Sequence, residues 1–431
     1  MSMQANPEPP DTTFDLLRTS TSSQRLSQIE KIRANGVGEV VDLPQLAVCG
    51  DQSAGKSSVL EGTTGMPFPR QEGLCTRFPT EIILRHVETS LPTTIFASIR
   101  PHSSRPEKEQ ESLKSYHKSL EAISELPSTI EEVSRLMGIR GYTDDGNGPA
   151  FTQDALRIEI IGSIGLHLSV VDLPGLISVA SEEQAEEDIR TVHNIAETYL
   201  QSSRTIILAV VQASNDIANQ GIIKMAGKYD PDGQRTVGII AKPDMNQGAE
   251  AKIARIAKNE DTIKLKLGFF LLKNPSPTEL EDHISMPARS ALELRFFSTP
   301  VWARQKLDPD RVGVDKLRRF LQQLLDTHNE RELPKVRNEI RKHLKVTEAE
   351  LVRLFLTNLS MKFYELLQAA LDGNYHTIDS DFFSEAEGPR LRVRVQEANT
   401  KFATAVRLKG KQRVIEPNCP SPTVSLSTAE K

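Results

Sequence analysis

The sequence predicts an α/β protein in which helices flank a mostly parallel central sheet, followed by an all-α segment. Strand-length apolar or β-branched runs recur through the first 300 residues, and helical patterns separate several of them. Beyond about residue 300 the apolar residues recur at helical spacing instead. In such a sheet the ligand site lies beyond the carboxyl ends of the strands. The predicted strands are residues 45–49, 81–84, 94–99, 156–161, 166–171, 205–211, 236–240 and 269–272.

The composition is that of an ordinary globular chain with two or three domains. Of its 431 residues 38% are hydrophobic and 26% are charged, and the formal net charge is −5. This charge argues against a nucleic-acid binder held by bulk electrostatics, so we expect no nucleic acid among the partners. No apolar run reaches the length of a membrane span, and the three cysteines fit no metal or disulfide spacing. We therefore expect a cytoplasmic protein.

Residues 45–60 read as a buried strand, a glycine loop and the first turn of a helix. The segment from Gly50 to Ser57, Gly-Asp-Gln-Ser-Ala-Gly-Lys-Ser, fits the phosphate-loop pattern. Its inward-facing N–H groups and the helix dipole favour a β-phosphate, while Lys56 would bridge the β- and γ-phosphates and Ser57 would hold Mg²⁺. The alternative is an ordinary glycine-rich turn, which the flanking strand and helix disfavour.

Two later segments offer ligands for the metal and the γ-phosphate. Asp172 ends the strand at 166–171, so its carboxylate can hold a Mg²⁺-bound water. Three residues on, Gly175 can offer its N–H to the γ-phosphate, and Thr76 can close over the nucleotide with its hydroxyl on Mg²⁺. Taken alone, each is an ordinary turn residue. The predicted phosphate-binding residues are Asp51, Gln52, Ser53, Ala54, Gly55, Lys56, Ser57, Ser58 and Gly175.

The strand at 236–240 leads into a candidate guanine-reading turn, Ala241-Lys242-Pro243-Asp244. Guanine presents N1–H and N2–H₂ side by side, and the carboxylate of Asp244 can accept both, whereas adenine has no such donor pair. The alkyl stem of Lys242 can cover the purine face. A charged turn at a strand end is the alternative, but the order of the three motifs is more specific than any one of them.

Together these residues resemble the dynamin superfamily of large GTPases over roughly residues 25–415. The resemblance is to Mx-like and vacuolar-sorting members, particularly fungal ones. It implies a P-loop GTPase domain that hydrolyses GTP to GDP and phosphate with Mg²⁺ and is activated by nucleotide-dependent dimerisation or assembly. It also implies a link to membrane remodelling or to organelle and vesicle trafficking. The matching segments are residues 50–61, 76–79, 172–175, 214–219 and 232–240.

The resemblance also implies roles for individual residues. Gln52 would orient the attacking water, and Ser53 would help to coordinate a monovalent cation, K⁺ or Na⁺, together with carbonyls around Gln71 and Gly73. Asp216 would reach across a dimer of GTPase domains, and Asn274 belongs to the last guanine-side loop. The implied sets are Gln52, Ser53, Lys56, Thr76 and Asp216 for catalysis, Lys242, Asp244 and Asn274 for guanine, and Ser57, Thr76 and Asp172 for the metal.

Two positions depart from the family pattern. Ala241 stands where the guanine motif usually begins with Thr, so we expect weaker ordering or affinity with an unchanged choice of base. Gln71 replaces a loop glycine, which bears on the carbonyls of the predicted cation site.

The expected domains are a tail and bundle-type helix at 1–36, a GTPase domain at 37–300, a connecting helix and partial stalk at 301–415, and a disordered tail at 416–431. The chain is thus expected to end within the stalk. Residues 101–150 are expected to form a charged surface insertion with one helix around 107–126. Expected partners are GTP or GDP, the chain itself or full-length relatives, and indirectly membranes or microtubules. The expected location is the cytoplasm, with peripheral attachment to organelle membranes.

Three functions remain open on the sequence alone. The first is a GTPase activated by dimerisation, and the second is a GTP-binding interaction module with little catalysis. The third is an ATP-using phosphoryl transferase, which Lys242 and Asp244 disfavour because they suit guanine.

Overall fold

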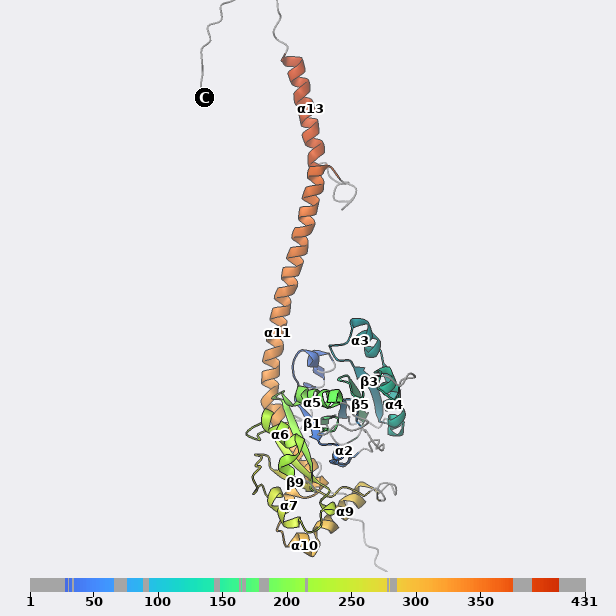
Figure 1. Cartoon of the computed structure of the whole chain (residues 1–431). Coiled ribbons are helices and arrows are strands. Elements are labelled where there is room, and N and C mark those ends of the chain that lie inside the picture. Colours follow the sequence, from blue (N-terminus) through green and yellow to red (C-terminus); the bar gives the residue numbers. More distant parts are fainter. Residues whose placement is uncertain are drawn as a thin grey trace, which may run out of the picture. The chain divides into compact units, whose positions relative to one another are not determined.

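The computed structural model describes residues 28–29, 31–32, 35–65, 76–87, 93–142, 148–162, 164, 168–177, 186–213, 216–276, 279, 285–374 and 390–410 (Figure 1). The chain divides into two compact units, residues 1–340 and 341–431. Most of the predicted N-terminal helix, the predicted tail, Gln71 and Gly73 lie outside the described residues. The predicted domain limits stay predictions.

Within the described residues of the first unit, nine strands form one sheet in the order β4-β3-β5-β2-β6-β1-β7-β8-β9. Strands β6, β1, β7, β8 and β9 run parallel to one another, whereas β2 is antiparallel to β6, and β3 is antiparallel to both β5 and β4. The predicted mostly parallel sheet is therefore confirmed. The strands are β1 (Gln45–Gly50), β2 (Thr80–His86), β3 (Thr94–Arg100), β4 (His117–Leu120), β5 (Ala155–Gly162), β6 (Leu168–Asp172), β7 (Thr205–Gln212), β8 (Thr236–Ala241) and β9 (Phe269–Leu272).

The central strands are apolar along their whole length because both faces of the sheet are covered. In β1, Leu46 and Val48 enter the core on one face, while Ala47 and Cys49 enter the core on the other. This alternation follows from the two-residue period of a strand. Both cores thus fix the end of β1, from which the phosphate loop begins.

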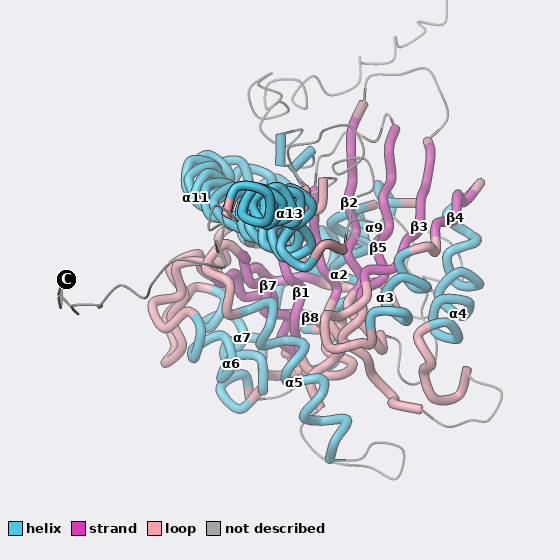
Figure 2. Tube along the Cα trace, turned by 90° about the horizontal axis from the view of Figure 1, so that it is seen from above, coloured by secondary structure: helices cyan, strands magenta, loops and turns pink. Residues whose placement is uncertain are grey.

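Helices cover both faces of the sheet. Buried residues of α2, α4 and the start of α11 belong to one core, and those of α5, α6 and α7 belong to the other. Figure 2 shows α5, α6 and α7 together along one side of the strands. These helices are α2 (Lys56–Thr64), α4 (Leu126–Leu136), α5 (Glu186–Leu200), α6 (Gly221–Tyr229), α7 (Glu250–Ala257) and α11 (Val314–Asp372).

The expectation of a single helix around 107–126 is wrong. The segment contains α3 (Glu107–Lys114), strand β4 and a short 3-10 helix before α4. His117 and Leu120 of β4 pair antiparallel with Ser98 and Ile95 of β3. The sequence of β4 is mostly polar, so the pairing with β3, rather than local propensity, makes this segment a strand.

Helix α11 contains 59 residues and Pro334, and it forms one continuous helix in the part of the chain where apolar residues recur at helical spacing. Its buried Leu317, Leu321 and Leu325 recur every four residues and pack on the sheet core. Further along, Val336 forms a small core with Ile29, Val41 and Leu43. Ile29 lies in one of the described pieces of the predicted N-terminal helix, so α11 is a packing partner of that segment.

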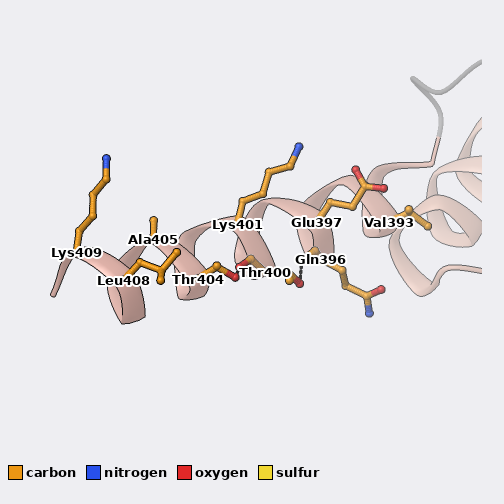
Figure 3. Close-up of a pocket in the computed structure, with 9 residues that line it drawn as sticks. All are labelled: Val393, Gln396, Glu397, Thr400, Lys401, Thr404, Ala405, Leu408 and Lys409. Carbon is orange, nitrogen blue, oxygen red and sulfur yellow. Dashed lines mark hydrogen bonds between the residues drawn. The ribbon is translucent and has the colours of Figure 1, made fainter. Parts of the chain in front are cut away.

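In the second unit, residues 341–372 of α11 and helix α13 (Leu391–Lys409) leave most of their apolar side chains exposed. Figure 3 shows Val393 and Leu408 on α13, with the polar side chains of Gln396, Thr400 and Thr404 between them. The hydroxyl of Thr400 donates to the Gln396 carbonyl at 2.8 Å. None of the described helices combines the length and apolarity needed to cross a membrane. Other large exposed apolar side chains of this unit include Leu344, Leu351, Leu354, Phe355, Leu359, Phe363 and Phe402.

Candidate nucleotide site

The loop between β1 and α2 closes through two residues with positive φ, Ser53 at 61° and Gly55 at 103°. A Cβ atom on Gly55 would lie 2.8 Å from the Nδ2 atom of Asn274 and 3.5 Å from the Cβ atom of Ala241. Only glycine accepts both this backbone conformation and this close approach. The loop therefore lies directly against the turns that follow β8 and β9.

Lys56, the first residue of α2, lies within the phosphate loop, and its side chain is buried. Its ammonium donates to the carbonyl oxygens of Gly50 at 3.3 Å and Asp51 at 3.2 Å. A Cβ atom on Gly175 would lie 2.9 Å from this Nζ atom, so the Asp-Leu-Pro-Gly turn contacts the loop at a residue without a side chain. A buried cation in the loop between a strand and a helix N-terminus suits a polyphosphate.

Asp172 ends β6 and is buried beside the loop. The hydroxyl of Thr76 donates to its Oδ2 atom at 3.1 Å, while its Oδ1 atom has no hydrogen-bond partner among the described residues. Burial raises the pKa of Asp172 to about 6, although the charge of Lys56 and the hydrogen bond from Thr76 lower it. A buried carboxylate oxygen without a partner fits a divalent cation.

The donor set around Asp172 also fits Mg²⁺, which takes few ligands from the protein and the rest from phosphates and water. Ser57, half-buried at the start of α2, offers the hydroxyl that the phosphate-loop pattern assigns to the metal. Among the described residues, no three His, Cys, Asp or Glu side chains converge on one point, so the chain offers no all-protein metal cage there.

We expect Asp172→Asn to stabilise the nucleotide-free protein at neutral pH. The folded state holds the Asp172 proton more tightly than the unfolded state does, so the stability from this group is complete at low pH and is lost as the pH rises through about 6. The amide does not titrate, so its advantage over wild type should grow by about 1.4 kcal/mol between pH 5 and pH 7.5. Urea unfolding without Mg²⁺ measures this, and an advantage independent of pH would contradict it.

The predicted guanine-side residues follow neighbouring strands. Lys242 has a φ of 58°, and its ammonium donates to the Ser53 carbonyl at 2.9 Å. Asp244 is exposed in the 3-10 turn Pro243–Met245. Asn274 is 6% exposed, yet neither atom of its side-chain amide has a hydrogen-bond partner among the described residues. Two orphaned polar atoms at this depth indicate a place for a polar ligand.

Other predicted residues take varied positions. The carboxylate of Asp51 accepts the backbone N–H groups of Gly221 at 3.3 Å and Ile222 at 3.4 Å, so it caps α6, and only its backbone is left for a phosphate. Gln52 and Ser53 are exposed, and Ala54 is buried. These exposed side chains are available to a second molecule.

Asp216 is exposed immediately before the 3-10 turn Ile217–Asn219, and the side chain of Asn219 donates to it at 3.3 Å. The carbonyl of Ser58 accepts a hydrogen bond from the buried guanidinium of Arg289 at 2.9 Å. Ala241 ends β8, is 0% exposed and lies beside the phosphate loop. The hydroxyl of the Thr in the family pattern would lie at the same place.

The motifs missed two buried charged residues, Arg289 and Glu293 of α9 (Met286–Phe297). Arg289 contacts α2, and Glu293 accepts the backbone N–H of Lys273, next to Asn274, at 2.9 Å. An Arg and a Glu four residues apart in a helix are typical of an exposed ion pair, so the local sequence carries no signal that distinguishes them.

Comparisons with known proteins agree with this geometry. A family model described as the dynamin family matches residues 46–243, and one described as the dynamin central region matches residues 252–381. The first match includes the phosphate loop, the Asp-Leu-Pro-Gly turn and the start of the guanine-reading turn.

Similar curated proteins include the interferon-induced GTP-binding protein Mx of Epinephelus coioides, 32% identical over 75% of this chain and 49% of that protein. They also include MxE of Danio rerio, 31% identical over 75% of this chain and 48% of the relative. Human Mx2 is 31% identical over 74% of this chain and 42% of its own length. The chain thus spans about half the length of the curated relatives it matches. With both family matches and this geometry, the chain belongs to the dynamin family.

Proposed function

We propose that the chain hydrolyses GTP to GDP and phosphate with Mg²⁺ and that contact between two GTPase domains activates it. One observation carries most of the proposal: the phosphate loop, the Lys242 turn and the orphaned amide of Asn274 meet at the carboxyl ends of neighbouring strands. Phosphate and base ligands of one nucleotide need this juxtaposition. The similar Mx proteins are named as GTP-binding.

In the proposed site the loop of residues 51–58 and Gly175 surround the phosphates, and Lys56 contacts the β- and γ-phosphates. The backbone N–H groups of Gln52 and Ala54 donate to the carbonyls of Leu176 and Asp51, so other N–H groups of the loop would bind the phosphates. Ser57, Thr76 and Asp172 would hold Mg²⁺, which neutralises charge on the phosphates when bound. Gln52 would orient the attacking water. Lys242 and Asp244 would read guanine together with Asn274. A K⁺ or Na⁺ ion beside Ser53 would neutralise charge that develops on the leaving group.

Asp216 is the residue that we assign to the dimer. It is exposed, as are Gln52 and Ser53, so a second GTPase domain that meets the nucleotide face could touch all three. We also propose that the chain acts in membrane remodelling or trafficking. Its indirect partners would be membranes or microtubules, and it would attach peripherally to organelle membranes. The domain limits 37–300 and 301–415 belong to the same proposal.

The GTP turnover per molecule should rise with protein concentration, because a dimer completes the site. We expect at least a tenfold rise between dilute and concentrated protein, and Asp216→Ala should flatten it without changing the affinity for GTP. Phosphate release at several protein concentrations measures both effects. The exposed Asp232→Asn is a matched control and should behave as wild type.

A second function, a GTP-binding module with little catalysis, is favoured by one observation: the helices of residues 341–372 and 391–409 leave large apolar side chains exposed. A partner that covers them would be required for assembly. Tight GTP binding with low turnover that does not depend on protein concentration would identify this module and contradict the dimer-activated enzyme.

A further inference from the structure

Two carboxylates, one buried and one half-buried, hold the guanine-side loop in place by accepting its backbone N–H groups. Its residues 273–276 follow β9 and carry Asn274, whose side-chain amide has no partner among the described residues. A buried amide that lacks partners costs free energy, so its position has to be imposed by other contacts. The backbone on both sides of Asn274 supplies these contacts.

On one side, Glu293 of α9 accepts the backbone N–H of Lys273 through Oε1 at 2.9 Å. On the other side, Glu279 accepts the backbone N–H of Ser276 through Oε2 at 2.7 Å. The same Glu279 oxygen accepts the ammonium of Lys273 at 2.8 Å. The backbone therefore has little freedom around Asn274, and the amide stays against the phosphate loop, where it leaves no room for a Cβ atom on Gly55.

Glu293 differs from Glu279 in its depth and in its second contact. Its side chain is 2% exposed, and its Oε2 atom accepts the backbone N–H of Val314, the first residue of α11, at 2.8 Å. The φ of 91° at Gly313 brings the chain into this position, where a Cβ atom would lie 3.3 Å from Oε2. One carboxylate thus accepts an N–H from the guanine-side loop and caps α11 as well.

Burial raises the pKa of Glu293, while the hydrogen bonds from the N–H groups of Val314 and Lys273 lower it. A carboxylate matches these two N–H groups, since each of its two oxygens accepts one of them. Glutamine has one accepting oxygen, and its NH₂ group would face the other N–H. A change from Glu to Gln therefore removes one anchor while it keeps the volume of the side chain.

We propose that Glu293 is a positioning residue for guanine recognition: it fixes the backbone at Lys273, sets Asn274 against the purine, and joins this loop to the start of α11. The inference rests on the proposed function, because it assumes a guanine nucleotide in the site. Glu293 does not touch the nucleotide itself, and it acts through Asn274.

The test is calorimetric binding of GDP and of inorganic tripolyphosphate, each with Mg²⁺, to the full chain and to E293Q. We expect E293Q to weaken GDP binding on the order of tenfold and to leave tripolyphosphate binding within about twofold of wild type, because the latter has no base. Equal weakening of both ligands, or no weakening of GDP binding, would overturn the inference. E332Q is the matched control, since Glu332 is 3% exposed and pairs with Lys335 at 2.8 Å and with Arg204 at 3.6 Å. Arg204 immediately precedes the first residue of β7, whereas the nucleotide loops follow the carboxyl ends of the strands.

A double-mutant cycle with N274A separates this role from general destabilisation. If Glu293 acts through Asn274, E293Q should weaken GDP binding little further in the N274A background. Additive effects would contradict the inference. If E293Q does not fold, E293D, which keeps the charge on a shorter side chain, replaces it in both measurements. Failure of the wild-type chain to bind GDP at all would instead refute the proposed function.

Discussion

Lys56→Ala should reduce GTP turnover at least a thousandfold. Lys56 is 8% exposed and its ammonium lies against the carbonyl of Gly50 in the phosphate loop, so it acts on the phosphates in a site with little water. Removal of one electrostatic contact of this kind costs on the order of 10²–10³ in rate, and the loss of a full charge costs more. Phosphate release from saturating GTP gives the rate.

The variant also loses the hydrogen bonds to the carbonyls of Gly50 and Asp51, so its fold needs a separate check. Lys252→Ala, on the exposed side of α7, is the matched control and should keep wild-type turnover. Thermal unfolding of both variants shows whether the loss is catalytic. If a folded Lys56→Ala protein hydrolyses GTP within tenfold of the wild-type rate, Lys56 does not act on the phosphates as proposed.

Asp244→Asn should change the choice of base from guanine to xanthine. A carboxylate accepts both N1–H and N2–H₂ of guanine, whereas asparagine accepts one N–H and donates its NH₂ group to the carbonyl at C2 of xanthine. Two hydrogen bonds to a charged group are involved, so GTP should bind about a hundredfold more weakly, and xanthosine triphosphate should bind more tightly than GTP.

Competition of GTP, ATP and xanthosine triphosphate for one labelled nucleotide measures the exchange. Asp232→Asn, another exposed carboxylate in a turn, is the control that should keep the preference for GTP. Equal binding of ATP and GTP by the wild-type chain would refute guanine reading and revive the ATP-using alternative. An Asp244→Asn variant that still prefers GTP would show that another residue reads the base.

The sequence predicts the central part of the fold well because these strands are buried on both faces. All six residues of β8 are buried and most of β7 is, so each appears as a run of apolar residues with sharp limits. Strand β4 escapes detection because its residues are mostly polar and its conformation depends on pairing with β3. The continuity of α11 is equally hard to read, since its apolar face changes partners along its length and Pro334 interrupts the pattern.

The motif residues of the site could be predicted because their chemistry depends on short-range spacing. Gly55, Lys56 and Ser57 are fixed by the turn from a strand into a helix, and Asp172 ends another strand of the same sheet. Glu293 could not be predicted, because its importance comes from two N–H groups that the fold brings to it, one from residue 273 and one from residue 314. The capping role of the Asp51 side chain was hidden for the same reason.

The two margins of the sheet are both poor templates for another strand. At one margin β4 has only four residues, including Lys118, which pairs with Glu132 at 2.7 Å. At the other, Leu271 of β9 bridges to Val312, and the guanidinium of Arg311 lies over the ring of Phe270. Short, charged or covered margins prevent edge-to-edge aggregation of sheets. Copies of this chain that associate must therefore do so through side chains rather than by extending a common β-sheet.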